Sequence, residues 1–173
     1  PRGAITDKLT PVGEVRSGWA GRIRFAEGRL NTGSTATVRL IHAVRRMETP
    51  AEFVILDAPP GTSCPLAATL SGVDRVVLVT EPTPFGLNDL SLAVETARML
   101  GLRLGIVINR DGAGDGRVDD YCASSGLEVI GRIPDNRLVA EVYSRGELPL
   151  AAVPEFREAL AGIAAHLTRE VAA

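Results

Sequence analysis

The chain has 173 residues, of which 45% are hydrophobic, and it carries a formal net charge of −2. This length suits a single domain with a sizeable core, and the charge excludes the strongly basic surface that is typical of nucleic-acid-binding proteins. The two cysteines, Cys64 and Cys122, provide neither a disulfide framework nor a metal-ligand spacing, so we expect a cytoplasmic protein. No apolar run reaches the roughly 18 residues of a membrane-spanning helix, so we expect no integral membrane segment.

The first fifty residues predict a β-hairpin followed by a helix. Polar and apolar residues alternate over 13–17 and 22–25, and Gly18 and Gly21 separate the two runs. This pattern is typical of a hairpin with one solvated face. Apolar residues at helical spacing then predict a helix over residues 35–47.

From residue 53 onward, strand-like and helix-like segments alternate. Uninterrupted apolar runs predict strands at residues 53–57, 75–80, 104–109 and 128–133. Helical patterns follow at residues 87–100, 118–125, 136–145 and 155–171. Apolar strands that alternate with helices indicate a parallel sheet covered on both faces. The predicted fold is α/β, a partial doubly wound and mostly parallel sheet with an N-terminal β-hairpin.

The last predicted helix allows two interpretations. Phe156, Leu160, Ile163 and Leu167 lie on one face of it, so it could rest on a membrane surface. That apolar face is modest and the charges are mixed, so we expect the helix to dock on the parent sheet instead.

Asp57 ends the first predicted strand, and Pro59, Pro60 and Gly61 follow it. Ligands bind at the carboxyl ends of strands in open α/β sheets, and a carboxylate there can hold a Mg²⁺-bound water. The prolines stiffen the turn, and Gly61 allows a backbone N–H to approach a phosphate oxygen. The alternative is an Asp that only caps the turn. No Gly-x-x-x-x-Gly-Lys-Ser/Thr phosphate-binding loop accompanies this strand anywhere in the sequence.

Polar residues also follow the next three predicted strands. Glu81-Pro82-Thr83-Pro84 forms a rigid loop after strand 75–80, and Asn88 or Asp89 is expected to cap the helix behind it. Asn109 ends strand 104–109, and its amide offers both a donor and an acceptor to the edge of a purine. The run Ile133-Pro134-Asp135-Asn136 lies at the same ligand edge. The alternative interpretation is that this run only starts a helix, with Asp135 or Asn136 as its cap.

Four of these runs together resemble the MinD/ParA-like deviant P-loop ATPases, most closely the branch with an inserted two-cluster ferredoxin domain. The runs are Asp-Ala-Pro-Pro-Gly-Thr-Ser-Cys-Pro from Asp57, Thr-Glu-Pro-Thr-Pro-Phe-Gly-Leu-Asn-Asp-Leu from Thr80, Ile-Asn-Arg from Ile108 and Ile-Pro from Ile133. They fall within residues 50–145, and the run from Thr80 is the most specific.

The resemblance implies a P-loop NTPase of the MinD type, a hydrolase that binds ATP and Mg²⁺ at a homodimer interface. Asp57 is then expected near Mg²⁺, through water, and Gly61 near the γ-phosphate, as the catalytic pair. The implied cofactor-binding residues are Glu81, Pro82, Asn109, Arg110 and Pro134. Cys64 is either a small buried hydrophobe or meets its counterpart across the two-fold axis.

Residues 1–5 resemble the segment that follows the last cysteine of a 4Fe–4S cluster motif. Residues 1–32 are therefore expected to hold the tail of the ferredoxin-like insert and the hairpin, and residues 33–173 the C-terminal part of the ATPase domain. The clusters would belong to the missing N-terminal segment only. The chain is a fragment, or another chain supplies the rest, or its lineage has lost the site.

The complete protein is expected to be an ATP-dependent switch coupled to iron–sulfur or electron-transfer work, with an iron–sulfur or redox protein as a partner. The chain as given is expected to be inactive alone because it lacks the phosphate-binding loop. The alternative function is a non-catalytic interaction module with a degenerate P-loop NTPase fold.

Overall fold

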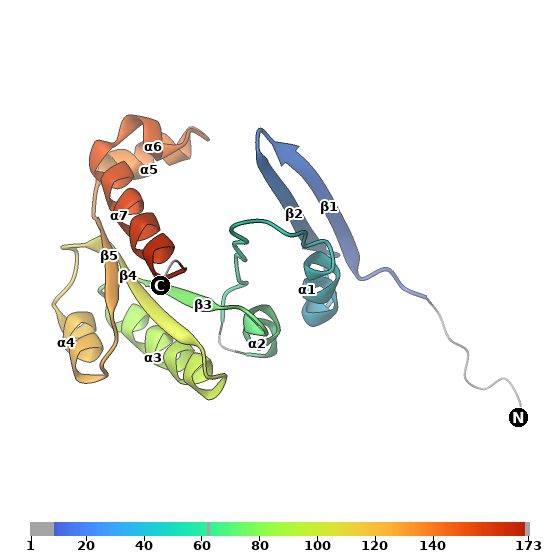
Figure 1. The fold of residues 1–173 in the computed structure, drawn as a ribbon, viewed down its shortest axis with the longest axis horizontal. Coiled ribbons are helices and arrows are strands. Elements are labelled where there is room, and N and C mark those ends of the chain that lie inside the picture. The colour runs from blue at the N-terminus through green and yellow to red at the C-terminus, as the bar shows by residue number, and fades with distance from the viewer. Residues whose placement is uncertain (1–8, 62, 172–173) are drawn as a thin grey trace, which may run out of the picture. The chain divides into compact units, whose positions relative to one another are not determined.

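Two units make up the chain in the computed structural model, Pro1–Ser71 and Gly72–Ala173. The structure describes residues 9–61 and 63–171 (Figure 1). The boundary expected between residues 32 and 33 falls inside the first unit and remains a prediction. None of the described helices is long and apolar enough to cross a membrane.

The first unit contains the predicted hairpin. Strands β1 (Gly13–Ala20) and β2 (Ile23–Leu30) pair antiparallel, from Gly13 opposite Leu30 to Ala20 opposite Ile23. Helix α1 (Thr37–Arg45) covers the base of β2 at Gly28. A Cβ atom at Gly28 would lie 2.8 Å from both Leu40 Cγ and Val44 Cγ2, so only glycine allows this close approach.

A second helix in this unit, α2 (Cys64–Leu70), was not expected from the sequence. The Arg45 side chain ties it to α1, because the guanidinium donates to the carbonyl oxygens of Ala68, Thr69 and Ser71 near the end of α2. Carbonyl groups at the end of a helix have no hydrogen-bond partner within that helix, and the Arg45 guanidinium supplies one here.

The predicted strand at residues 53–57 is wrong. These residues adopt no regular secondary structure, and the side chains of Phe53, Val54 and Ile55 are 48%, 52% and 91% exposed. An apolar run becomes a strand only when its backbone groups pair with a neighbour, and none of the described strands pairs with this segment.

The second unit confirms the predicted α/β sheet. Strands β3 (Arg75–Thr80), β4 (Arg103–Asp111) and β5 (Val129–Pro134) are parallel and lie in the order β3-β4-β5. The helices of this unit are α3 (Pro84–Met99), α4 (Arg117–Ser124), α5 (Arg137–Ser144), α6 (Pro149–Ala152) and α7 (Pro154–Val171).

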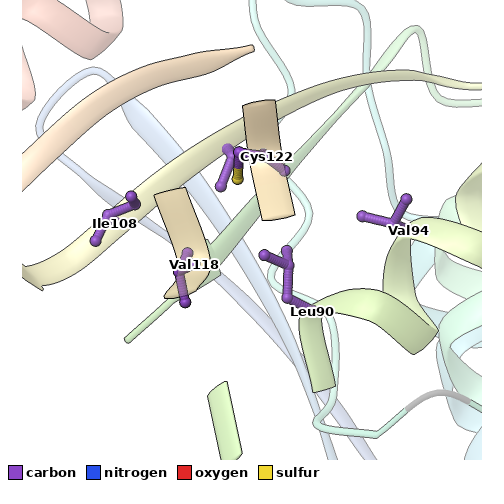
Figure 2. Packing of buried hydrophobic residues seen from close by; sticks show 6 residues of the cluster. Leu90, Val94, Ile108, Val118 and Cys122 are labelled. Carbon is purple, nitrogen blue, oxygen red and sulfur yellow. The ribbon is translucent and has the colours of Figure 1, made fainter. Parts of the chain in front are cut away.

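Alternating residues of β4 supply both faces of the core. Ile106 and Ile108, which are fully buried, pack with Leu90 and Val94 of α3 and with Val118 and Cys122 of α4 (Figure 2). Val107 points to the opposite face and packs with residues of β5 and α7. Burying side chains of this size stabilises the fold by roughly 1.5–3 kcal/mol each, which fixes the positions of the strand ends.

Helix α7 docks on the sheet, as the sequence predicted. Ile163 packs against Val107 and Ile130. A Cβ atom at Gly131 would lie 2.7 Å from Ile163 Cδ1, so glycine in β5 is what lets the helix approach the sheet so closely.

Candidate functional site

The carboxyl ends of the three parallel strands bring together the polar residues of the second unit. Glu81 follows β3, Asn109 and Arg110 lie at the end of β4, and Pro134 ends β5. The register places Asn109 beside Ile133 and Asp111 beside Pro134. The structure therefore gathers the five residues expected to bind the nucleotide, Glu81, Pro82, Asn109, Arg110 and Pro134, along one edge of the sheet.

Arg110 bridges the two outer strand ends of this edge. Its Nη1 lies 3.4 Å from Glu81 Oε2, and its Nε lies 3.1 Å from Asp135 Oδ1. The hydrogen bond with Asp135 contributes most to raising the pKa of Arg110, and the Glu81 charge adds to it. All three side chains are about half exposed, so each pair contributes little to stability. The bridge therefore orients the two carboxylates rather than holding the fold.

The backbone at Arg110 is strained. Its φ angle is +53°, and it is the one residue other than glycine with a positive φ in the described part of the chain. The pairing of β4 with β5 is irregular here, since Asn109 and Asp111 find partners in β5 and Arg110 does not. For a residue other than glycine, a positive φ of this kind costs roughly 1–2 kcal/mol. The bulge in the pairing redirects the side chain at this position. Strain of this sort concentrates at functional sites.

The helix cap that follows the Glu81–Pro84 loop was assigned to the wrong residue, and the rigidity of the loop remains a prediction. Helix α3 begins at Pro84, and the Thr83 side chain accepts the Gly86 N–H at 3.0 Å. Neither Asn88 nor Asp89 caps the helix, because Thr at the cap with Pro directly after it starts the helix one turn earlier. A Cβ atom at Gly86 would lie 3.0 Å from Thr80 Oγ1 and even closer to the Glu81 carbonyl oxygen, so glycine is required where the helix folds back on the loop.

The loop after β4 rests on Pro82, a contact that was not expected from the sequence. A Cβ atom at Gly114 would lie 2.5 Å from Pro82 Cβ and still closer to the Pro82 carbonyl oxygen. The only signal for it is the run Asp-Gly-Ala-Gly-Asp-Gly from Asp111. A glycine-rich loop thus covers part of the Glu81–Pro82 segment.

A second arginine fixes the other end of this loop. Arg132 of β5 forms ion pairs with Asp119 of α4 and with Asp111, whose Oδ1 lies 3.1 Å from Arg132 Nη1. The hydrogen bond with Asp119 contributes most to raising the pKa of Arg132. Nothing in the sequence pattern singled out Arg132, because its two partners come from two other elements, β4 and α4.

Asn136 caps helix α5, which follows the same strand edge. Its Oδ1 accepts the Leu138 N–H at 2.9 Å. The predicted helix start at this position is therefore confirmed. The cap leaves Pro134 and Asp135 as the side chains of this run that face the ligand edge next to Arg110.

Asp57 and Gly61 belong to the first unit, which is described by itself. Asp57 is exposed in the irregular segment, and Gly61 has a φ of +103°, a conformation that favours glycine. Cys64 is exposed at the start of α2, so it is not the small buried hydrophobe considered above. No group of three or more His, Cys, Asp or Glu side chains among the described residues is arranged to hold a metal ion. The catalytic and Mg²⁺ roles of Asp57 and Gly61 remain predictions.

Two solved structures of the cell-division protein MinD have a similar fold. The described fold is similar to MinD of Aquifex aeolicus, with a TM-score of 0.60 and 18% identity over 76% of this chain and 59% of that one. It is also similar to MinD of Pyrococcus furiosus, with a TM-score of 0.59 and 20% identity over 77% of this chain and 57% of that one. The chain therefore has an α/β fold of the MinD-type P-loop NTPases.

Sequence relatives agree with this class. The chain is 28% identical to the uncharacterized protein MJ0579 of Methanocaldococcus jannaschii over 83% of its own length and 51% of that protein. It is 28% identical to the uncharacterized ATP-binding protein MJ0685 of the same organism (62% and 44%) and to the iron-sulfur cluster carrier protein of Aquifex aeolicus (69% and 38%). No family model matches the sequence.

The resemblance to MinD/ParA-like P-loop ATPases is thereby confirmed, and the inserted ferredoxin remains a prediction. The chain spans about half the length of MJ0579 and less of the other two relatives.

Proposed function

We propose that the chain is the C-terminal part of an ATP-binding switch protein of the MinD type. The observation that carries the proposal is the arrangement at the sheet edge, where a strained Arg110 holds Glu81 and Asp135 on either side of Asn109. A relative named as ATP-binding and MinD structures with the same fold support it.

The residues at this edge fit the base of a nucleotide. Asn109 is half-buried at the end of β4, and its amide can both donate to and accept from a purine edge. Pro134 offers an apolar surface at the same edge, and the Glu81 and Asp135 carboxylates are both paired with Arg110. The sequence contains no phosphate-binding loop to fit the phosphates. The edge of the sheet is thus proposed as the adenine end of the site.

In the complete protein, we assign the phosphate end to Asp57 and Gly61 together with a phosphate-binding loop from outside this chain. Mg²⁺-ATP would supply the bond that is hydrolysed, Asp57 would hold a water of the Mg²⁺ shell, and the Gly61 N–H would approach the γ-phosphate. Two subunits would close on the nucleotide as a homodimer. We assign the switch to iron–sulfur work because a carrier protein of that kind is among the relatives.

The irregular segment at residues 53–57 favours a second candidate. Asp57 is exposed and does not end a strand, which is what a degenerate fold without a working phosphate site would show. Such a protein would be a non-catalytic interaction module that keeps its sheet and its partner surface.

Nucleotide binding to the complete protein separates the two functions. We expect Mg²⁺-ATP to bind, and Asn109→Ala to raise Kd about tenfold, the equivalent of one hydrogen bond. The control Arg157→Ala changes an exposed residue of α7 and should leave Kd unchanged. No ATP binding by a folded complete protein would support the interaction module. If Asn109→Ala leaves the Kd for Mg²⁺-ATP unchanged, the base binds elsewhere.

A further inference from the structure

The tip of the β1–β2 hairpin, residues 18–25, exposes large apolar side chains. Trp19, Ile23 and Phe25 are 74%, 68% and 56% exposed. Figure 1 shows the turn of the hairpin at the end away from α1. Exposed large apolar groups that cluster in this way mark a surface that contacts something else.

The apolar side chains lie on both faces of the ribbon. Trp19 stands opposite Arg24, while Phe25 and Ile23 stand opposite Gly18 and Ala20, so the strand register puts Trp19 on one face and the other two on the reverse face.

Helix α1 covers the Trp19 face only at the hairpin base. It contacts Gly28, which stands opposite Val15. Trp19 lies four residues further along β1, about 13 Å away. The tip therefore extends beyond the helix that covers the base.

The tip and the base of the hairpin also differ in charge. Arg22 and Arg24 lie in the tip, and residues 18–25 include no carboxylate. The carboxylates of the hairpin are at its base, where Glu14 forms an ion pair with Arg16 at 2.8 Å and Glu27 stands opposite Arg16. The tip is thus a cationic and apolar end on a chain whose formal net charge is −2.

We propose that this tip inserts into the headgroup layer of an anionic lipid surface. The flat surface of a protein partner would cover one face of a two-stranded ribbon, whereas a headgroup layer surrounds the tip and covers Trp19 and Phe25 together. Tryptophan prefers the membrane interface, and arginines near it are attracted to anionic lipids. The contact is peripheral and does not depend on the proposed nucleotide site.

Trp19 is itself the probe, because the chain has a single tryptophan. The emission of the protein is recorded with vesicles of phosphatidylcholine alone and with vesicles of equal parts phosphatidylcholine and phosphatidylglycerol. We expect a blue shift and protection from acrylamide quenching with the anionic vesicles only, both weakened by high salt. Arg22→Gln with Arg24→Gln should weaken vesicle binding about 30-fold. The control Arg39→Gln with Arg157→Gln removes two exposed arginines outside the hairpin and should bind as the unchanged protein does.

Four results would overturn the proposal. They are emission that is already blue-shifted without vesicles, no shift with anionic vesicles, an equal shift with phosphatidylcholine alone, and full binding by the tip variant when circular dichroism shows it folded. A blue shift produced by soluble polyglutamate at the same charge concentration, and not by vesicles, would assign the tip to an acidic protein partner instead.

Discussion

Replacing Gly114 with alanine tests how the candidate site is built. The added Cβ atom would lie 2.5 Å from Pro82 Cβ and closer still to the Pro82 carbonyl oxygen. Real Cβ atoms do not approach other atoms so closely, and the atoms on Pro82 belong to a stiff ring and to the backbone, so they cannot turn away. Either the loop moves off Pro82 or the strand edge shifts. Overpacking of this kind costs roughly 1–3 kcal/mol.

Urea unfolding and amide hydrogen exchange measure the two ways of relieving the clash. We expect the free energy of unfolding of Gly114→Ala to fall by about 1–3 kcal/mol, or exchange to rise selectively across residues 112–116. The control is Gly162→Ala in α7, where nothing lies within 4 Å of the new Cβ atom. That variant should be about 0.5–1 kcal/mol more stable, because alanine favours a helix over glycine. If Gly114→Ala behaves like the control and its loop exchanges normally, the loop does not rest on Pro82.

Four further outcomes are expected. Calorimetry with Mg²⁺-ATP on this chain alone should detect no micromolar binding, since loop N–H groups and a lysine make most phosphate contacts, and a clear micromolar Kd would point to another site. In the complete protein, Asp57→Asn should lower turnover about a hundredfold and keep the fold, whereas unchanged turnover would make Asp57 only a turn cap. Sedimentation should show self-association of this chain, because β3 has an unpaired edge among the described strands and residues 53–55 are exposed, and a compact monomer at low concentration would contradict this. A chromogenic disulfide reagent should label exposed Cys64 in the folded chain and Cys122 only in urea, and equal labelling rates for the two thiols would refute the burial of Cys122. Burial, and after it the Asp119 charge, raises the pKa of Cys122. The free energy of unfolding should therefore fall as pH rises above about 8.5, where the thiol ionises in the unfolded chain only.

The sheet of the second unit could be predicted because its signal is local. Strands β3, β4 and β5 are rich in consecutive apolar residues, and the helices between them keep a 3.6-residue period. The convergence of Glu81, Asn109 and Pro134 followed from the same prediction, since the carboxyl ends of parallel strands share one edge. The start of α3 was missed, because the pattern of apolar residues begins only at Leu87, although Thr83 before Pro84 is itself a start signal.

The segment at residues 53–57 could not be decided from its own sequence. A strand is stabilised by hydrogen bonds to a neighbour, so the same five residues form one in one context and not in another. Helix α2 has seven residues, too few for a period to show. The contact of Gly114 with Pro82 and the ion pairs of Arg132 join residues that are 13 or more positions apart, and no single-sequence pattern encodes such pairs.

Arg132 turns the glycine-rich loop into a closed ring. Its guanidinium holds Asp111 where the loop leaves β4 and Asp119 in the first turn of α4, so both ends of residues 111–119 are fixed to one side chain of β5. A loop with fixed ends has little conformational entropy left to lose. A small displacement of the loop at Pro82 is therefore taken up by residues 112–116 between the two fixed ends, and a larger one acts on β5 and α4 together through the Arg132 side chain.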